Sequence, residues 1–212
     1  MNPRFADITL EGQHVRLEPL TMAHADELRI AASGPRDTFN YTWVPEPTVE
    51  DVTRYVHEAE RQRDAGLGHT FATIRCVDHS VVGSTRYMNA EYWTTADRRT
   101  RDGVAPDALE IGSTWLSSTA QRSGVNTEAK LLMLDHAFGV LGVKRVTFKT
   151  DARNQRSRDN IERVGAVFEG VLRSHMAASD GGVRDSAMYS VLAAEWPTAR
   201  ARLAARLRPM IT

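Results

Sequence analysis

The sequence predicts a single α/β (α+β) domain with a mixed, mostly antiparallel sheet of about six to seven strands flanked by helices. Its 212 residues fit one domain, and no linker, internal repeat or low-complexity segment divides them. The stretch 109–165 runs strand, helix, strand, helix, which is the order of a βαβ unit with a parallel strand pair. We therefore treat 1–212 as one domain, with its core at about 10–196.

The N-terminal part predicts a strand followed by two helices. Residues 14–19 alternate between apolar and polar side chains, which is typical of a strand with one buried face. Helical spacing follows at 22–32 and at 49–65, and each segment begins after a threonine, Thr21 or Thr48, that can cap it. The residues between them, 34–47, combine prolines with polar and aromatic side chains and are expected to form a loop.

The next segments predict a hairpin and a long loop. Strand patterns at 70–77 and 81–88 are separated by the turn sequence Asp78-His79-Ser80. Residues 91–108 are polar and contain proline and glycine, which indicates a loop long enough to have a functional role.

The second half of the chain completes the sheet. The expected elements are a strand at 109–117, a helix at 127–141, a strand at 145–150, a helix at 157–164, strands at 167–175 and 188–192, and a closing helix at about 195–207. The helix at 127–141 carries apolar residues around most of its circumference, so we expect it to be buried on more than one side.

Composition excludes several classes of function. The chain has 27 basic and 27 acidic residues, so its formal charge gives no general attraction to nucleic acid or membrane. No apolar stretch approaches the ~18 residues of a membrane span, and the N-terminus has no signal core, which predicts a cytoplasmic protein. The single Cys76 has no partner for an internal disulfide, and we expect no metal because the usual ligand spacings are absent.

The turn between the strand at 109–117 and the following helix is a candidate phosphate site. A helix N-terminus presents free N–H groups and the positive end of the helix dipole, which attract phosphate. Gly124 permits an unusual backbone angle and close approach of a ligand, and Arg122 adds a charged donor. The alternative is an ordinary strand-to-helix loop with an Asn or Thr cap. The P-loop and GxGxxG patterns are both absent.

Several short motifs occur in a fixed order along the chain. They are Glu110-Ile111-Gly112, Gln121-x-x-Gly124-x-Asn126, Asn126-Thr127-Glu128-Ala129, Lys149-Thr150-Asp151-x-x-Asn154-x-x-Ser157 and Asp180-Gly181-x-x-Arg184-Asp185. Together they resemble the GNAT superfamily of acetyl-CoA-dependent N-acetyltransferases, in particular its RimJ/RimL-like branch. The final position of the family's acyl-CoA loop is Gly or Ala, whereas this sequence has Asn126.

The resemblance implies a binding mode for acetyl-CoA as co-substrate. The strands at 109–117 and 145–150 would splay apart, with the pantetheine arm between them. N–H groups of the turn and helix start would hold the pyrophosphate, Asn154 would bond the arm, and Ser157 would lie near the sulfur. The implied cofactor-binding residues are Trp115, Leu116, Gln121, Arg122, Ser123, Gly124, Val125, Asn126, Thr127, Asn154 and Ser157.

The chemistry requires a base or a desolvating site for the attacking amine, whose pKa of about 10 keeps it mostly protonated at neutral pH. Glu110 is the candidate base, acting through water; the alternative is a strand carboxylate paired with arginine. Many family members use a tyrosine acid at the position of Ile161, so the resemblance assigns the acid or thiol-anchor role to Ser157. A helix N-cap is the other interpretation of Ser157.

The acceptor side is predicted mainly from aromatic residues on loops. Tyr41, Trp43 and Trp93 are candidate substrate-binding residues, because loop aromatics often line clefts; each is alternatively a half-buried anchor. His175 is a candidate for accepting the amine proton or for lining the pocket.

The resulting hypothesis is an acyl-CoA-dependent N-acyltransferase that transfers acetyl to a primary amine by direct attack on the thioester. The acceptor is a protein N-terminal α-amine or a small-molecule amine, and the protein is a monomer or homodimer. The alternatives are a succinyl or other acyl-CoA transferase, and a catalytically idle CoA-binding sensor or interaction module.

Overall fold

The computed structural model describes residues 8–93 and 105–207, and these form one eight-stranded sheet in the order β1-β2-β3-β4-β5-β6-β8-β7. The strands are β1 Leu10–Glu11, β2 Val15–Pro19, β3 Gly68–Arg75, β4 Val81–Glu91, β5 Ala108–Leu116, β6 Arg145–Asp151, β7 Val167–Ala177 and β8 Val183–Leu192. Neighbouring strands are antiparallel except for β5 and β6. The predicted mixed, mostly antiparallel sheet with a central βαβ unit is confirmed.

The expected strand count of six to seven is too low because the sequence pattern does not reveal β1. The Gly12 amide donates to the Val15 carbonyl (2.9 Å), and this tight turn pairs Leu10 with Leu17. Two residues are too few to show an alternating pattern in a sequence.

Helices surround the sheet at the positions that the sequence predicts, with changed boundaries. They are α1 Ala25–Ala32, α2 Val49–Asp64, α3 Gly124–Asp135, α4 Gln155–Arg163 and α5 Trp196–Leu207, together with the short turns η2 Met22–His24, η3 Arg36–Phe39, η4 Ser118–Ala120 and the π-helical η5 His136–Val140. The helix expected at 127–141 therefore starts at Gly124 and changes to π-helical geometry after Asp135.

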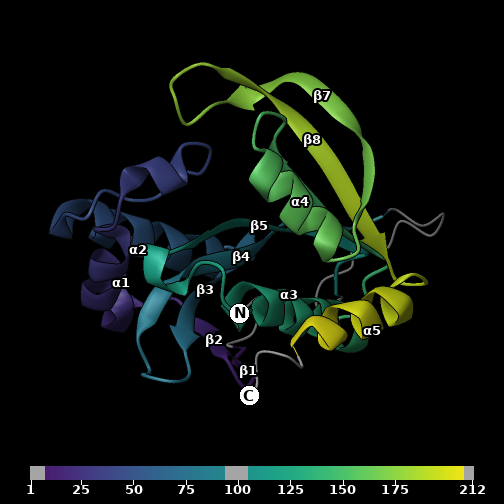
Figure 1. The fold of residues 1–212 in the computed structure, drawn as a ribbon, viewed down its shortest axis with the longest axis horizontal. Helices are drawn as coiled ribbons and strands as arrows, with labels where there is room; N and C mark the ends of the chain where they lie inside the picture. The colour runs from purple at the N-terminus through teal and green to yellow at the C-terminus, as the bar shows by residue number, and fades with distance from the viewer. Residues whose placement is uncertain (1–7, 94–104, 208–212) are drawn as a thin grey trace.

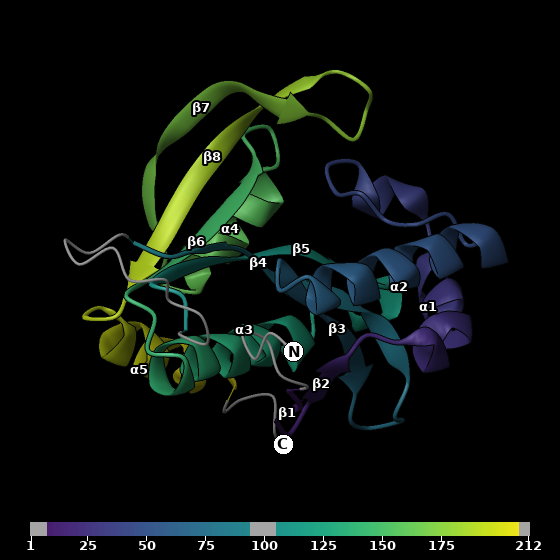
Figure 2. The ribbon, with the colours of Figure 1, turned by 180° about the vertical axis from the view of Figure 1, so that it is seen from behind.

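The two faces of the sheet carry separate apolar cores. One core packs Phe71, Met133 and Tyr189 with residues of α3, α4 and α5, whereas the other packs Tyr55 and Trp115 with residues of α1 and α2. Figures 1 and 2 show α3 and α5 side by side below the central strands β4 and β5. This arrangement places α3 and α4 on the opposite face from α1 and α2.

The long β7–β8 ribbon extends beyond β6 and arches over α4 (Figure 1). At its tip the Ser179 hydroxyl donates to the Asn40 carbonyl (2.7 Å), which joins the ribbon to the loop after η3. Within the described residues, no helix is long and apolar enough to cross a membrane.

Candidate active site

The central feature of the site is the separation of β5 from β6. The two strands pair only where Ala108, Leu109 and Glu110 lie beside Arg145, Val146 and Thr147. Beyond Glu110, β5 continues to pair with β4, while β6 continues to pair with β8. Among the described strands, none pairs with the β6 side of 111–116, so this edge leaves backbone groups for a ligand.

A bulge in β5 accompanies the separation. The register with β4 shifts between the pairs Arg86–Gly112 and Ser84–Trp115, and Ser113 has a left-handed φ of 47°. A bulge of this kind bends its strand and increases the local twist. The bulge therefore explains how β5 diverges from β6 without losing β4.

The N-terminus of α3 begins where β5 ends. Ser123 caps the helix by accepting from the Val125 amide (3.3 Å) and donating to the Ala120 carbonyl (2.6 Å). The cap is thus Ser123 and not the Asn or Thr of the alternative interpretation. The other N–H groups of the first turn have no helical partner, which is the condition for binding phosphate.

The backbone conformations of this turn differ from the prediction. The left-handed residue is Arg122, with φ 60°, and not Gly124. Gly124 instead packs closely on a side chain, since an added Cβ would lie 3.1 Å from the His14 ring. The Asn126 side-chain oxygen is buried and has no hydrogen-bond partner among the described residues.

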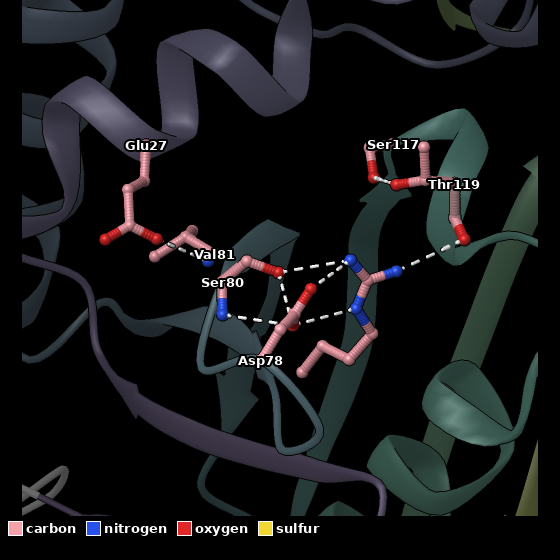
Figure 3. A network of polar contacts seen from close by, with 7 residues as sticks. Glu27, Asp78, Ser80, Val81, Ser117 and Thr119 are labelled. Carbon is pink, nitrogen blue, oxygen red and sulfur yellow. Dashed lines mark hydrogen bonds and ion pairs between the residues drawn. The ribbon is translucent and has the colours of Figure 1, made fainter.

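A polar network fixes the segment between β5 and α3, as Figure 3 shows. The Arg75 guanidinium pairs with Asp78 (2.6 Å) and donates to the Thr119 carbonyl (3.4 Å). Arg75 also holds the pKa of the Asp78 carboxyl far below its usual range. The Ser117 and Thr119 hydroxyls share a hydrogen bond of 3.1 Å within this segment, at the start of η4.

Gln121 connects the two halves of the site. Its amide nitrogen donates to the Leu116 carbonyl (2.9 Å), and its amide oxygen accepts from Arg156 on α4 (2.7 Å). The Leu116 carbonyl therefore already accepts one hydrogen bond at the end of β5. Trp115 is buried against Phe39, with ring centroids 6.1 Å apart.

Asn154 caps α4, so the interpretation of Ser157 as the N-cap is wrong. The Asn154 side-chain oxygen accepts from the Ser157 amide at 3.0 Å. This leaves the Ser157 hydroxyl half-buried in the first turn of α4. The starts of α3 and α4 thus both follow the carboxyl ends of the two parallel strands, the usual location of ligands in such sheets.

Glu110 is buried at the last position where β5 and β6 pair. Its carboxylate pairs with Lys149 (3.1 Å) and accepts from the Asn89 side chain (2.9 Å). The expected alternative partner was an arginine, and the sequence reasoning missed Lys149. The alternation of side chains along β6 could have revealed this partner. Lys149 lies two residues after Thr147, which is paired with Glu110, so all three side chains lie on one face of the sheet.

Arg153, which the sequence reasoning did not select, joins three segments beside the end of β6. It binds the Asp151 carboxylate (2.7 Å) and Asp180 at the tip of the β7–β8 ribbon (2.9 Å). Its guanidinium also lies 5.2 Å from the centre of the Tyr41 ring. The Arg153 side chain holds the pKa of Asp151 below its ordinary value.

The predicted acceptor aromatics do not form one cluster. Tyr41 lies beside Arg153, after β6, whereas Trp93 lies 5.6 Å from the Lys144 ammonium, before β6. Trp43 is 64% exposed and packs on Tyr55, at 5.6 Å between ring centroids. Most of the loop predicted at 91–108 lies outside the described residues.

His175 contacts Ser186, the β8 residue that is paired with Asp151 on β6. Its Nδ1 is 2.9 Å from the Ser186 hydroxyl. No group of three or more His, Cys, Asp or Glu side chains able to hold a metal occurs in the described parts of the chain.

These features define an α/β protein whose central sheet opens between two parallel strands and beside two helix N-termini. An extended ligand with an anionic end fits this arrangement, because a strand edge and free helical amides lie in succession. The chain matches the acetyltransferase (GNAT) domain over residues 14–167, and it belongs to this acetyltransferase family. The predicted family is thus confirmed.

Solved structures support the same assignment. A GCN5-related N-acetyltransferase from Brucella melitensis is 31% identical with a TM-score of 0.81, covering 96% of this chain and 86% of that one. A putative acetyltransferase from T. thermophilus is 35% identical with a TM-score of 0.75, covering 94% of this chain and 96% of that one. RimJ from Mycobacterium smegmatis, in complex with CoA-disulfide, shares the fold at 22% identity and a TM-score of 0.73, covering 95% of each chain. Among curated proteins, none matches the chain.

Proposed function

We propose that the protein transfers an acetyl group from acetyl-CoA to a primary amine. The observation that carries this proposal is the separation of β5 and β6 beyond Glu110, at the N-termini of α3 and α4. The bound co-substrate would supply an activated thioester carbonyl, which the amine attacks directly. Other acyl-CoA molecules, including succinyl-CoA, are alternatives that the same opening would accommodate.

The chain's own groups suggest how acetyl-CoA is held. The open β5 edge near Trp115 and Leu116 would bond the pantetheine arm as a further strand. Amides in the first turn of α3, together with Arg122, would bind the pyrophosphate. The Asn154 side-chain oxygen caps α4, which leaves its NH2 group to donate to the arm.

Glu110 is proposed as the proton acceptor for the amine, acting through water. Lys149 pairs with its carboxylate at 3.1 Å and holds it in place beside the opening. Ser157 is proposed to donate to, or hold, the leaving thiolate from the first turn of α4. His175 is the second candidate for the proton acceptor, since it lies on β7 and contacts the adjoining strand β8.

The proposed acceptor is a protein N-terminal α-amine or a small-molecule amine. A ribosomal-protein-S5-alanine acetyltransferase from Vibrio fischeri has the same fold at 19% identity and a TM-score of 0.68, covering 90% of this chain and 99% of that chain. The residues proposed to contact the acceptor are Tyr41, Trp43, Trp93 and His175. The protein would act in the cytoplasm without nucleic acid or membrane, as a monomer or homodimer.

A catalytically idle CoA-binding module is the second candidate, and two observations favour it. Glu110 is engaged by both Lys149 and Asn89, and the family's usual tyrosine position is Ile161. A thiol-release screen of amines and N-terminal peptides with acetyl-CoA and succinyl-CoA separates the two. Acceptor-dependent release supports the transferase, whereas CoA binding without release supports the idle module.

Ser157→Ala tests the proposed acid in the same assay. We expect a slower transfer rate than in the wild type. The deficit should be greatest below about pH 8.5, where the leaving thiolate takes up a proton. An unchanged rate across pH would remove Ser157 from the mechanism.

A further inference from the structure

Arg184 on β8 is a half-buried cation that forms no direct ion pair with any of the described residues. Its Nε donates to the Ser186 hydroxyl (3.0 Å). Burial lowers the pKa of its guanidinium. Arginine nevertheless stays charged, and a desolvated charge is unfavourable until an anion pairs with it.

The nearby carboxylates are already engaged. The charge of Arg184 interacts with Asp151 and Glu110. Asp151, however, is held through both oxygens by Arg153, at 3.0 and 2.7 Å, and Glu110 is paired with Lys149 at 3.1 Å. The two terminal nitrogens of Arg184 therefore remain for a further acceptor.

Arg184 lies on the face of the sheet that carries Glu110. Alternate residues share a face, so Arg184 lies on the same side as Ser186, whose partner on β6 is Asp151. Asp151, Lys149 and Thr147 alternate along β6, and Thr147 is the partner of Glu110. Phe148 and Tyr189 face the opposite core, with α3 and α4. Arg184 is consequently separated by the sheet from the helix termini proposed to bind CoA.

We propose that Arg184 binds a carboxylate of the acceptor, so that the enzyme selects amines that carry a carboxylate close to the nucleophilic nitrogen. This inference rests on the proposed transferase function and names its substrate class. A guanidinium presents parallel donors that match both oxygens of a carboxylate, which gives orientation as well as affinity. Binding there would place the amine on the Glu110 side of the sheet.

Matched amines test the selection in the full-length protein. The assay measures thiol release from acetyl-CoA with alanine against alaninamide, and with C-terminally amidated peptides beginning Ser-Glu against Ser-Gln. The first pair reports free amino acids and the second reports acidic N-terminal peptides. We expect kcat/KM to favour the carboxylate in at least one pair by about tenfold, the size of one charge-assisted hydrogen bond.

Arg184→Gln should abolish this preference by lowering kcat/KM for the carboxylate amine, while the rate with the neutral amine stays within about twofold. Arg184→Lys retains the charge but not the paired donors, and should keep an intermediate preference. Arg54→Gln is the matched control, because Arg54 pairs with Glu50 and Asp51 on the outside of α2. It should retain the full preference.

The outcomes separate this inference from the proposed function. Equal rates for both members of each pair would overturn the role of Arg184 and leave the transferase intact. An equal loss with charged and neutral amines in Arg184→Gln would also overturn it, since that loss indicates a structural role. Absence of thiol release with every amine would overturn the transferase, and this inference with it.

Discussion

Lys130 is a buried lysine whose protonation should make stability depend on pH. It lies on α3, is 6% exposed, and donates to the hydroxyls of Thr85 (3.0 Å) and Thr114 (2.6 Å) at the β5 bulge. No ion pair with Lys130 occurs in the described parts of the chain. Burial lowers its pKa from 10.5 to about 7.

The sign of the effect follows from proton binding in the two states. Between pH 7 and pH 10.5 the unfolded chain binds the Lys130 proton more strongly than the folded chain does, so stability rises with pH. Below about pH 7 both states are protonated and this contribution is constant. The shift corresponds to a gain of about 2 kcal/mol between pH 7 and pH 9.

Lys130→Met removes the titrating group and retains an unbranched side chain of similar length. Thr85 and Thr114 remain hydrogen-bonded to each other at 2.7 Å, so neither hydroxyl is left alone. Urea unfolding of both proteins at pH 7, 8 and 9 gives the difference in unfolding free energy, in which other titrations cancel. The wild type should gain about 2 kcal/mol relative to the variant across this range. A difference that is independent of pH would refute the assignment of a neutralised, buried Lys130.

Three further substitutions test the packing of the fold and the chemistry of the site. Glu128→Gln should lower the unfolding free energy in urea by about 3 kcal/mol, because the carboxylate accepts from three backbone amides at 2.9, 2.6 and 2.9 Å; a loss below about 1 kcal/mol would contradict this. Gly83→Ala places a Cβ 2.1 Å from the Trp115 carbonyl, so thermal unfolding should occur at lower temperature by several degrees, and an unchanged midpoint would show that β4 and β5 adapt freely. Glu110→Gln should slow acetyl transfer by about 10²-fold while the calorimetric Kd for CoA is unchanged, and a parallel change in both would indicate a structural role.

The sequence predicts the order of the elements well, because long strands and helices carry clear periodic patterns. It fails at β1, whose two residues pair only because the Gly12 turn brings them beside β2. It also places the start of α3 too late, at Thr127. Ser123 belongs to the predicted phosphate turn, but its capping hydrogen bond depends on a backbone geometry that the sequence does not display.

The site is predicted unevenly for a related reason. Motifs that are contiguous in the chain, such as the turn before α3, are legible in the sequence. Contacts between segments that are distant in the chain cannot be identified from the sequence. The pairing of Lys149 with Glu110 is one such contact, and the position of Arg153 between Asp151 and Asp180 is another. The three candidate acceptor aromatics do not come together, because Trp93 and Tyr41 lie at opposite ends of β6.

Amide hydrogen exchange with and without acetyl-CoA tests the central claim, that the opening between β5 and β6 holds the co-substrate. Acetyl-CoA should slow exchange at 111–116 on β5 and in the first turns of α3 and α4, because these amides gain hydrogen bonds or lose access to solvent. The outer face of α2 should show no change. Protection that is absent from β5 and the start of α3, at acetyl-CoA concentrations that saturate the protein, would contradict the account.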